Sequence, residues 1–463
     1  MDQKDALPAG CQLYPLKQYA VLPGPFQRGV NDPSFYAYSS ETGELVAPLN
    51  PSKPFVVYHP DFLKLLGNEP NLSLIATTEG TNEYGPLFHE AGVWIEETKE
   101  VVFTSNCNPQ FRNVLGRIRL DALSPPESRT LTSSWDLLPI TPAASSPPSV
   151  IASNGATIYR VNGKDKLLVC CQGTDQIPSN LSVVDPISGE SYPILNNFGG
   201  RPFNAINDVV VLPPLAPVGQ ESNDPLTDRL DLHDDPLTTI WFTDPTYAHM
   251  QGYKRPPQLP NQVYCFTPAT GDVRVVADGF YMPNGICFSP SGDTCYITDT
   301  GMILGDGRID PQRPGTIYAY DVVRARPGEK DSRTGREVDL TAVQPRLENR
   351  RVFAFCDSGI PDGIKTDKEG NVYSGTGEGV SVWNSSGTLL GKIVLFPSRP
   401  SPSSPSNLSP VPLPQTLPTT NPAHKTRYCA NFNFCPDGRL CILAEDRVYV
   451  AQLDKGVEGA LLP

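Results

Sequence analysis

An apolar run, a polar turn and a second apolar run follow one another repeatedly along the chain. Six copies can be read, at residues 92–106, 156–173, 207–245, 284–300, 362–376 and 431–445. Their turns carry Gly, Asp or Lys, as in SPSGD (289–293) and CPDG (435–438). Gly and Asp tolerate the backbone angles of tight hairpins, so each copy predicts two short antiparallel β-strands.

A third strand follows most of these hairpins. The candidates alternate or are β-branched, at residues 115–122, 181–190, 262–276, 315–323, 380–394 and 448–453. Three to four strands per unit, repeated six times, predict an all-β fold, a six-bladed β-propeller with four-stranded antiparallel blades. The last copy ends near the C-terminus, so we expect an N-terminal strand to close the ring. Residues 72–78 are the preferred candidate, and residues 55–59 are the alternative.

The remaining segments suggest how the chain is divided. Residues 1–71 show weak periodicity and are expected to wrap the outside of the propeller, and they contain the alternative closing strand, while residues 72–463 form the propeller. Residues 397–427 are rich in Pro, Ser and Thr and cannot bury a core. We therefore interpret them as a disordered insertion before the last blade.

Composition narrows the classes of function. The 50 prolines and 38 glycines favour turns and short strands over long helices. A formal net charge of −13 without a basic run argues against nucleic-acid binding. No stretch is long and apolar enough for a membrane span, and the first residues lack the apolar core of a signal peptide. A cytoplasmic protein is expected, or a secreted one if a leader was removed. The scattered cysteines are read as small buried apolar residues.

Four polar residues stand at the starts of predicted innermost strands. They are Glu90, Asn207, Asn284 and Asp362, at equivalent places in four repeats. Each alone reads as an ordinary turn or strand-end residue. In a propeller, however, the innermost strands line a central tunnel, so symmetry would bring the four side chains together at one end. Two carboxylates and two amide oxygens form a hard, all-oxygen set that suits Ca²⁺, with another divalent cation possible.

Several motifs extend this interpretation. HEAGVW (89–94), INDVVV (206–211), IWFTDPTY (240–247), PNGICFSPSGDTCYITDT (283–300) and IPDGIKTDKEGNVY (360–373) resemble the SMP-30/gluconolactonase family, and most closely its gluconolactonase or fungal lactonohydrolase branch. The resemblance is clear over about residues 85–376. It implies that Glu90, Asn284 and Asp362 bind calcium, that Asn207 binds calcium or the substrate beside it, and that Asp362 is the catalytic carboxylate.

The resemblance also implies a chemistry. Calcium would polarise the carbonyl of a lactone, and Asp362, kept ionised by a depressed pKa, would activate water or attack directly. Several members of the family that act on sugar lactones carry Arg two residues before the tunnel Asn. Here that position is Ala205, which weakens the case for gluconolactone as substrate.

Other residues are candidates for substrate contact or for supporting the ligands. In an alternating strand the side chain of His89 would point away from the metal, so a packing role is preferred. His249 and Tyr247 could reach the tunnel mouth. Asp299 ends a second strand, as Asp244 does, and reads as a structural turn acid with a supporting role as the alternative.

Three functions are compatible with the sequence. The first is a metal-dependent carboxylic ester hydrolase, a calcium-dependent lactonase. The second is an enzyme of the same fold with different chemistry, such as organophosphate or aryl ester hydrolysis or a natural-product biosynthetic step. The third is a non-catalytic propeller that binds proteins. The expected partner is a small lactone or ester, and the protein is expected to be a monomer or dimer.

Overall fold

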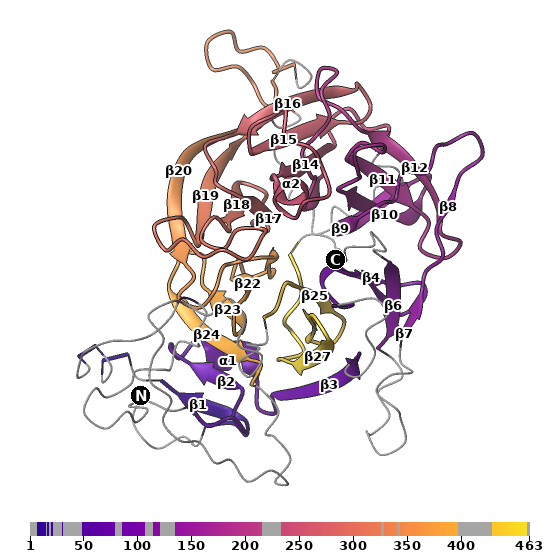
Figure 1. Cartoon of the computed structure of the whole chain (residues 1–463). Coiled ribbons are helices and arrows are strands. Elements are labelled where there is room, and N and C mark those ends of the chain that lie inside the picture. Colours follow the sequence, from indigo (N-terminus) through magenta and orange to yellow (C-terminus); the bar gives the residue numbers. More distant parts are fainter. Residues whose placement is uncertain are drawn as a thin grey trace.

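Six β-sheets surround a central axis in the computed structural model of the chain (Figure 1). The structure describes residues 7–14, 16–17, 20–21, 30, 49–78, 86–106, 114–120, 135–214, 233–325, 328–339, 343–396 and 428–460. We number the sheets as blades 1 to 6 in the chain order of their innermost strands. The predicted six-bladed β-propeller is confirmed.

Blades 1, 3 and 4 have four antiparallel strands each, in chain order from the axis outward. Blade 1 contains β4 (Glu90–Ile95), β5 (Glu100–Thr104), β6 (Leu115–Arg119) and β7 (Trp135–Leu137). Blade 3 contains β13 (Val209–Leu212), β14 (Thr239–Asp244), β15 (Gln262–Thr267) and β16 (Asp272–Ala277). Blade 4 contains β17 (Pro283–Phe288), β18 (Thr294–Asp299), β19 (Thr316–Val323) and β20 (Arg346–Phe355).

Blades 2 and 5 are larger than the predicted four strands. Blade 2 contains β9 (Ser153–Val161), β10 (Lys164–Cys171), β11 (Asn180–Val184) and β12 (Glu190–Leu195), with β8 (Thr141–Pro142) parallel to β12. Blade 5 contains β21 (Ile364–Thr366), β22 (Val372–Thr376), β23 (Gly379–Trp383) and β24 (Leu389–Val394). Its outer edge also carries β2 (Phe55–Val57) and then β1 (Cys11–Leu13). The additional strands cover edges that would otherwise be exposed.

Blade 6 is built from both ends of the chain. It contains β25 (Asn431–Cys435), β26 (Arg439–Ala444) and β27 (Arg447–Gln452), and β3 (Asn71–Thr77) is its outermost strand. β3 runs antiparallel to β27, from the pair Asn71–Gln452 to the pair Thr77–Arg447. The ring is therefore closed by β3, whereas residues 55–57 pair with blade 5. The proposed insertion at 397–427 lies outside the described residues.

Apolar side chains fill the wedges between neighbouring blades. Trp241 of blade 3 packs edge-to-face on Phe288 of blade 4, with ring centroids 5.4 Å apart. The described cysteines are buried and none forms a disulfide, in agreement with the sequence interpretation. Two short helices were not predicted, α1 (Phe62–Leu66) and α2 (Tyr247–Met250). Neither of these helices, among the residues that the structure describes, has the length and apolar character needed to cross a membrane.

Candidate metal and active site

One polar residue from each of the six blades stands at the start of the innermost strand. The six residues are Glu90, Asn154, Asn207, Asn284, Asp362 and Asn431, and we call them the polar ring. All six side chains belong to residues that are at least nine-tenths buried. Buried carboxylates and amides of this kind need partners, so their convergence calls for an explanation.

Threonine hydroxyls fix the backbone of the polar ring. A threonine near the end of a second strand donates to the backbone carbonyl of the ring residue in the next blade. These bonds run from Thr104 to Asn154 (2.9 Å), from Thr243 to Asn284 (2.7 Å) and from Thr298 to Asp362 (3.1 Å). The same short side chain at the same phase of three repeats therefore sets the position of three ring residues.

Glycine follows three of the ring residues because the neighbouring blade leaves no room for a side chain. A Cβ at Gly285 would lie 2.4 Å from the carbonyl oxygen of Asp362. Cβ atoms at Gly155 and Gly363 would lie 2.5 Å from side-chain atoms of Asp208 and Asn431. The inner strands thus approach each other closely, and the ring side chains are brought together in a narrow space.

The ring opens into a cavity of about 340 Å³, which we call the upper cavity. Glu90, Asn207, Asn284 and Asp362 all line it, so the structure brings the four predicted residues together as expected. The lining also includes His89, Asn106, Asn154, Gln172, Tyr247, Gln251, Ile303, Leu304, Ile360, Tyr428 and Glu445, with glycines at 305, 307, 359 and 377.

Three ring oxygens in this lining are buried without a hydrogen-bond partner among the described residues. They are Oδ1 of Asn154, Oδ1 of Asn207 and Oδ1 of Asp362. Such groups are rare because each loses its bonds to water on burial. The described residues contain no group of three His, Cys, Asp or Glu side chains arranged for a metal. Two carboxylates with amide oxygens instead form the hard oxygen set that suits calcium.

Hydrogen bonds orient the two carboxylates of the ring. Asn431 donates its Nδ2 to Oε2 of Glu90 at 2.7 Å. The hydroxyl of Tyr428 donates to Oδ2 of Asp362, which leaves Oδ1 as the oxygen without a partner. The Asp362 carboxylate is therefore fixed through Oδ2, and Oδ1 is left to bind another group.

In the protein without a cation, burial is the main influence on the pKa values of these two carboxyl groups. Desolvation, followed by the charge of Asp362, raises the pKa of Glu90 to about 8. Desolvation also raises the pKa of Asp362 to about 7, against the opposing effects of His89 and Tyr428. The depressed pKa expected for Asp362 is thus not a property of the protein without a cation, because burial outweighs the neighbouring donors. A bound cation would favour the ionised forms.

His89 lies in the wall of the upper cavity, contrary to the expectation that it points away. His89 lies one residue before β4 begins, so the strand alternation that would direct its side chain away does not extend to it. Nδ1 of His89 lies 2.8 Å from Oε1 of Glu445. Burial disfavours the charged imidazole, but Glu445, Glu90 and Asp362 outweigh it and raise the pKa of His89 to about 9. His89 and Glu445 therefore form a charge pair at the rim.

Of the other three candidates, Tyr247, His249 and Asp299, only Tyr247 lines the upper cavity. Tyr247 lines the cavity, bonds through its hydroxyl to that of Thr300 and accepts a long hydrogen bond of 3.5 Å from Nδ2 of Asn284. His249 does not line it, because α2 turns its exposed side chain toward the carbonyl of Lys254. The Asp299 carboxylate accepts backbone N–H groups of residues 281, 282 and 301 outside the lining. Neither His249 nor Asp299 lines the upper cavity. Asp299 holds the backbone of a turn, and the substrate contact considered for His249 and the supporting role considered for Asp299 stay predictions.

Sequence reasoning missed Asn154, Asn431, Tyr428 and Glu445. Asn154 precedes a glycine as Asn284 does, so its signal was present, but the second repeat was read as starting at residue 156. Asn431 begins the sixth repeat and was not connected with the other four. Tyr428 and Glu445 carry no local signal, because their partners Asp362 and His89 are distant in the sequence.

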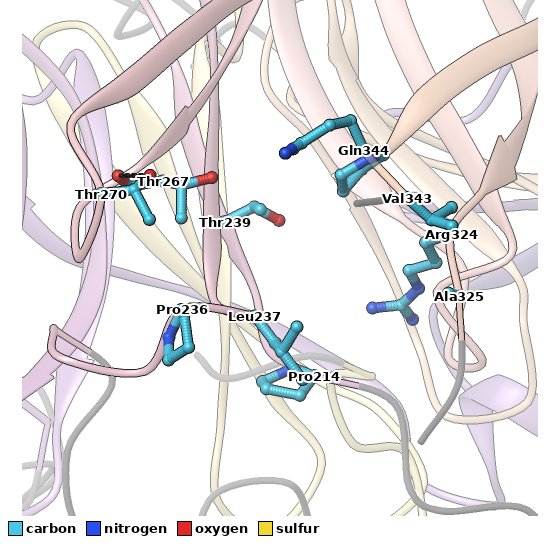
Figure 2. A pocket seen from close by; sticks show the side chains of 11 residues that line it. Pro214, Pro236, Leu237, Thr239, Thr267, Thr270, Arg324, Ala325, Val343 and Gln344 are labelled. Atoms are coloured by element: carbon cyan, nitrogen blue, oxygen red, sulfur yellow. Dashed lines mark hydrogen bonds between the residues drawn. The ribbon is translucent and has the colours of Figure 1, made fainter. Parts of the chain in front are cut away.

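Two other cavities have linings that contain none of the polar-ring residues. The opposite end of the tunnel forms a wider cavity of about 630 Å³ lined by inner strands of the blades, with Asp208 and Lys365 in its wall. Asn207 faces the upper cavity and the next residue, Asp208, faces this one. The other is a crevice of about 60 Å³. Figure 2 shows its lining, with Thr239, Thr267 and Thr270 across from Arg324 and Gln344. Neither contains the polar ring.

Comparisons with known proteins find a family model, sequence relatives and solved structures that are similar to this chain. Residues 216–304 match the model of the SMP-30/Gluconolactonase/LRE-like region. Over this segment the chain is similar to that family. The lactonohydrolase oryL of Aspergillus oryzae is 28% identical over 388 residues, which cover 81% of this chain and 76% of the relative. The gluconolactonase of Zymomonas mobilis is 24% identical over 250 residues, covering 53% and 56%. The predicted resemblance is confirmed.

A solved structure supports the fold independently. A gluconolactonase from Xanthomonas campestris superposes with a TM-score of 0.53 at 20% identity, and covers 86% of this chain and 94% of its own. At this level of identity the likeness shows the propeller fold. The arguments about the site therefore rest on the residues of the upper cavity itself.

Proposed function

We propose that this protein is a calcium-dependent hydrolase that opens the ring of a lactone in the upper cavity. The observation that carries the proposal is the set of three buried ring oxygens that have no hydrogen-bond partner among the described residues, in a ring that contains two buried carboxylates. The relatives named lactonohydrolase and gluconolactonase support the reaction type. Glu90, Asn207, Asn284 and Asp362 would hold the cation, and Asn154 is added to this set because its Oδ1 is also without a partner.

A bound calcium ion would supply a Lewis acid that polarises the lactone carbonyl and offsets the negative charge of the transition state. The side chains of the upper cavity would orient the carboxylate and supply the base or nucleophile. Tyr428 fixes Asp362 through Oδ2, which leaves Oδ1 without a hydrogen-bond partner among the described residues, at the edge of the cavity that Asp362 lines. Asp362 can accept a proton from a water molecule whose oxygen attacks the carbonyl carbon; the ring C–O bond then breaks and the alkoxide oxygen takes up that proton. Alternatively Asp362 attacks the carbonyl carbon itself, the ring C–O bond breaks with protonation of the alkoxide, and water then hydrolyses the acyl intermediate. Asn207 contacts either the cation or the substrate beside it.

The test compares lactone hydrolysis in calcium, in EDTA and in the variant Asp362→Asn. This variant keeps the size and one oxygen of the side chain but removes the base and the charge. We expect activity to disappear in EDTA, to return with calcium, and to fall by about 10²–10⁴-fold in Asp362→Asn. Asp321→Asn is the matched control, because its carboxylate lies on the outer part of blade 4 and pairs with Arg351.

The outcomes separate the parts of the proposal. Full activity in EDTA, with no metal detected by mass spectrometry, would show that hydrolysis does not depend on calcium. Tight calcium binding without hydrolysis of any lactone would leave the metal site and reject the reaction. An absence of calcium binding by calorimetry would reject the site.

A further inference from the structure

The wall of the upper cavity is divided by polarity around the ring. Amide side chains stand on the side of blades 1 and 2, where Asn106 follows β5, Asn154 lies in β9 and Gln172 follows β10. Apolar side chains stand on the side of blades 4 and 5, where Ile303 and Leu304 follow β18 and Ile360 precedes β21. A molecule lying across the ring would therefore meet hydrogen-bonding groups on one side and apolar groups on the other.

The apolar side is a formed surface. The loop after β18 is closed on itself by backbone hydrogen bonds, from Leu304 N to Arg308 O (2.9 Å) and from Gly307 N to Leu304 O (2.7 Å). It also packs on α2, since a Cβ at Gly305 would lie 2.9 Å from Cδ1 of Tyr247. The apolar wall is therefore held in place before a ligand arrives, which lowers the cost of binding.

The described lining offers no positive charge to an anionic substrate. It contains no Lys or Arg, and its one histidine, His89, is paired with Glu445. Lys254 lies behind the wall, where its ammonium donates to three backbone carbonyls, those of Gln172, Phe203 and Asn204. A divalent cation in the ring would balance Glu90 and Asp362. An additional carboxylate or phosphate would then be desolvated without a partner.

We propose that the substrate is an uncharged lactone with an alkyl substituent, whose ring lies over the polar ring and whose substituent contacts Ile303, Leu304 and Ile360. This inference rests on the proposed function and names its substrate class. A volume of about 340 Å³ is near the lower end for small-molecule pockets, which fits a lactone ring with a short chain.

The test measures kcat/KM for γ-butyrolactone and for its methyl-, ethyl- and propyl-substituted forms, beside a γ-lactone that carries a carboxylate at the same position. We expect kcat/KM to rise about fourfold per methylene that reaches the apolar wall. The carboxylate-bearing lactone is expected to be at least about tenfold worse than the methyl form. In Leu304→Asn the dependence on chain length should be reduced by half or more. Val352→Asn, on the outer strand of the same blade, is the matched control, because Val352 is 67% exposed.

Binding of the corresponding lactams, measured by calorimetry on the calcium-loaded protein, tests the same preference without turnover. If no lactone is hydrolysed, the proposed function fails, but lactam affinity that rises with chain length still supports the inference. Equal rates and affinities for all chain lengths, or a preference for the carboxylate, would overturn the inference and leave the lactonase proposal intact. A Leu304→Asn variant that keeps the wild-type dependence on chain length would also overturn it.

Discussion

Gly285→Ala tests whether close contact between blades 4 and 5 holds the polar ring in shape. The added methyl would lie 2.4 Å from the carbonyl oxygen of Asp362 and 3.1 Å from the backbone nitrogen of Ile364. Both obstacles are backbone atoms, so a side-chain rotation cannot relieve them. Gly285 has no positive φ, so the effect comes from space alone.

The expected loss of unfolding free energy follows from the 2.4 Å between the added Cβ and the carbonyl oxygen of Asp362. A carbon atom in ordinary contact lies roughly 3.5 Å away, so the two inner strands must separate by about 1 Å. Overpacking of this kind costs about 1–3 kcal/mol of unfolding free energy. The strain falls on the carbonyl that Thr298 binds, directly beside the Asp362 side chain. Changes to groups that orient a metal ligand typically weaken metal affinity by about 10–100-fold.

Two measurements separate stability from site geometry. Urea unfolding in EDTA, followed by tryptophan fluorescence, gives the free energy of unfolding of the metal-free protein. Calorimetric titration of the folded protein gives the calcium affinity. Gly456→Ala is the matched control, because a Cβ there meets only a carboxylate oxygen of Asp454, at 3.3 Å, and should leave both quantities nearly unchanged. Wild-type calcium affinity in a destabilised Gly285→Ala protein would refute the claim that this contact sets the ring.

Three further predictions concern single groups. Tyr428→Phe removes the donor to Asp362 and should lower kcat by about 10–100-fold with a smaller change in KM, which steady-state kinetics on the best lactone would show. Lys392→Met removes the cation that pairs with the buried carboxylate of Glu378 and should lower the free energy of unfolding by about 3–5 kcal/mol. Lys368→Met, from an exposed pair with Glu458, should change it by less than about 1 kcal/mol in the same urea assay. Burial raises the pKa of Glu90 from 4.5 to about 8 and that of Asp362 to about 7, so the folded metal-free protein binds more protons than the unfolded chain in this window. Its stability should fall as pH rises from about 4.5 to 8 while calcium affinity rises with proton release, and pH-independent affinity would contradict this.

The repeat of hydrophobic positions predicted the number of blades because each blade is a local hairpin with its own turn chemistry. The turn at Ser289–Asp293 is an example, since Gly292 has a φ of 70° that favours glycine there. Radial symmetry then placed four ring residues correctly from sequence position alone. The same reasoning could have given Asn154 and Asn431, because they occupy the same phase of their repeats.

Other features depended on tertiary contacts that the pattern does not encode. His89 lies just before β4, where the alternation of a strand does not apply, and the sequence pattern does not show that the strand begins only at Glu90. Tyr428 reaches Asp362 from a segment 66 residues later in the chain. The additional strands of blade 5 come from residues 11–13 and 55–57, whose periodicity is too short to show where they pair.

The hydrogen bond between Asn431 and Glu90 joins residues 341 positions apart, across the junction between the last blade and the first. During synthesis the N-terminal blades can fold as they leave the ribosome, but β3 must wait for β27 before blade 6 exists. The polar ring is incomplete until that moment. A nascent or truncated chain with five well-formed blades would therefore have a core but not the complete upper cavity, and formation of this cavity would report that the whole ring has closed.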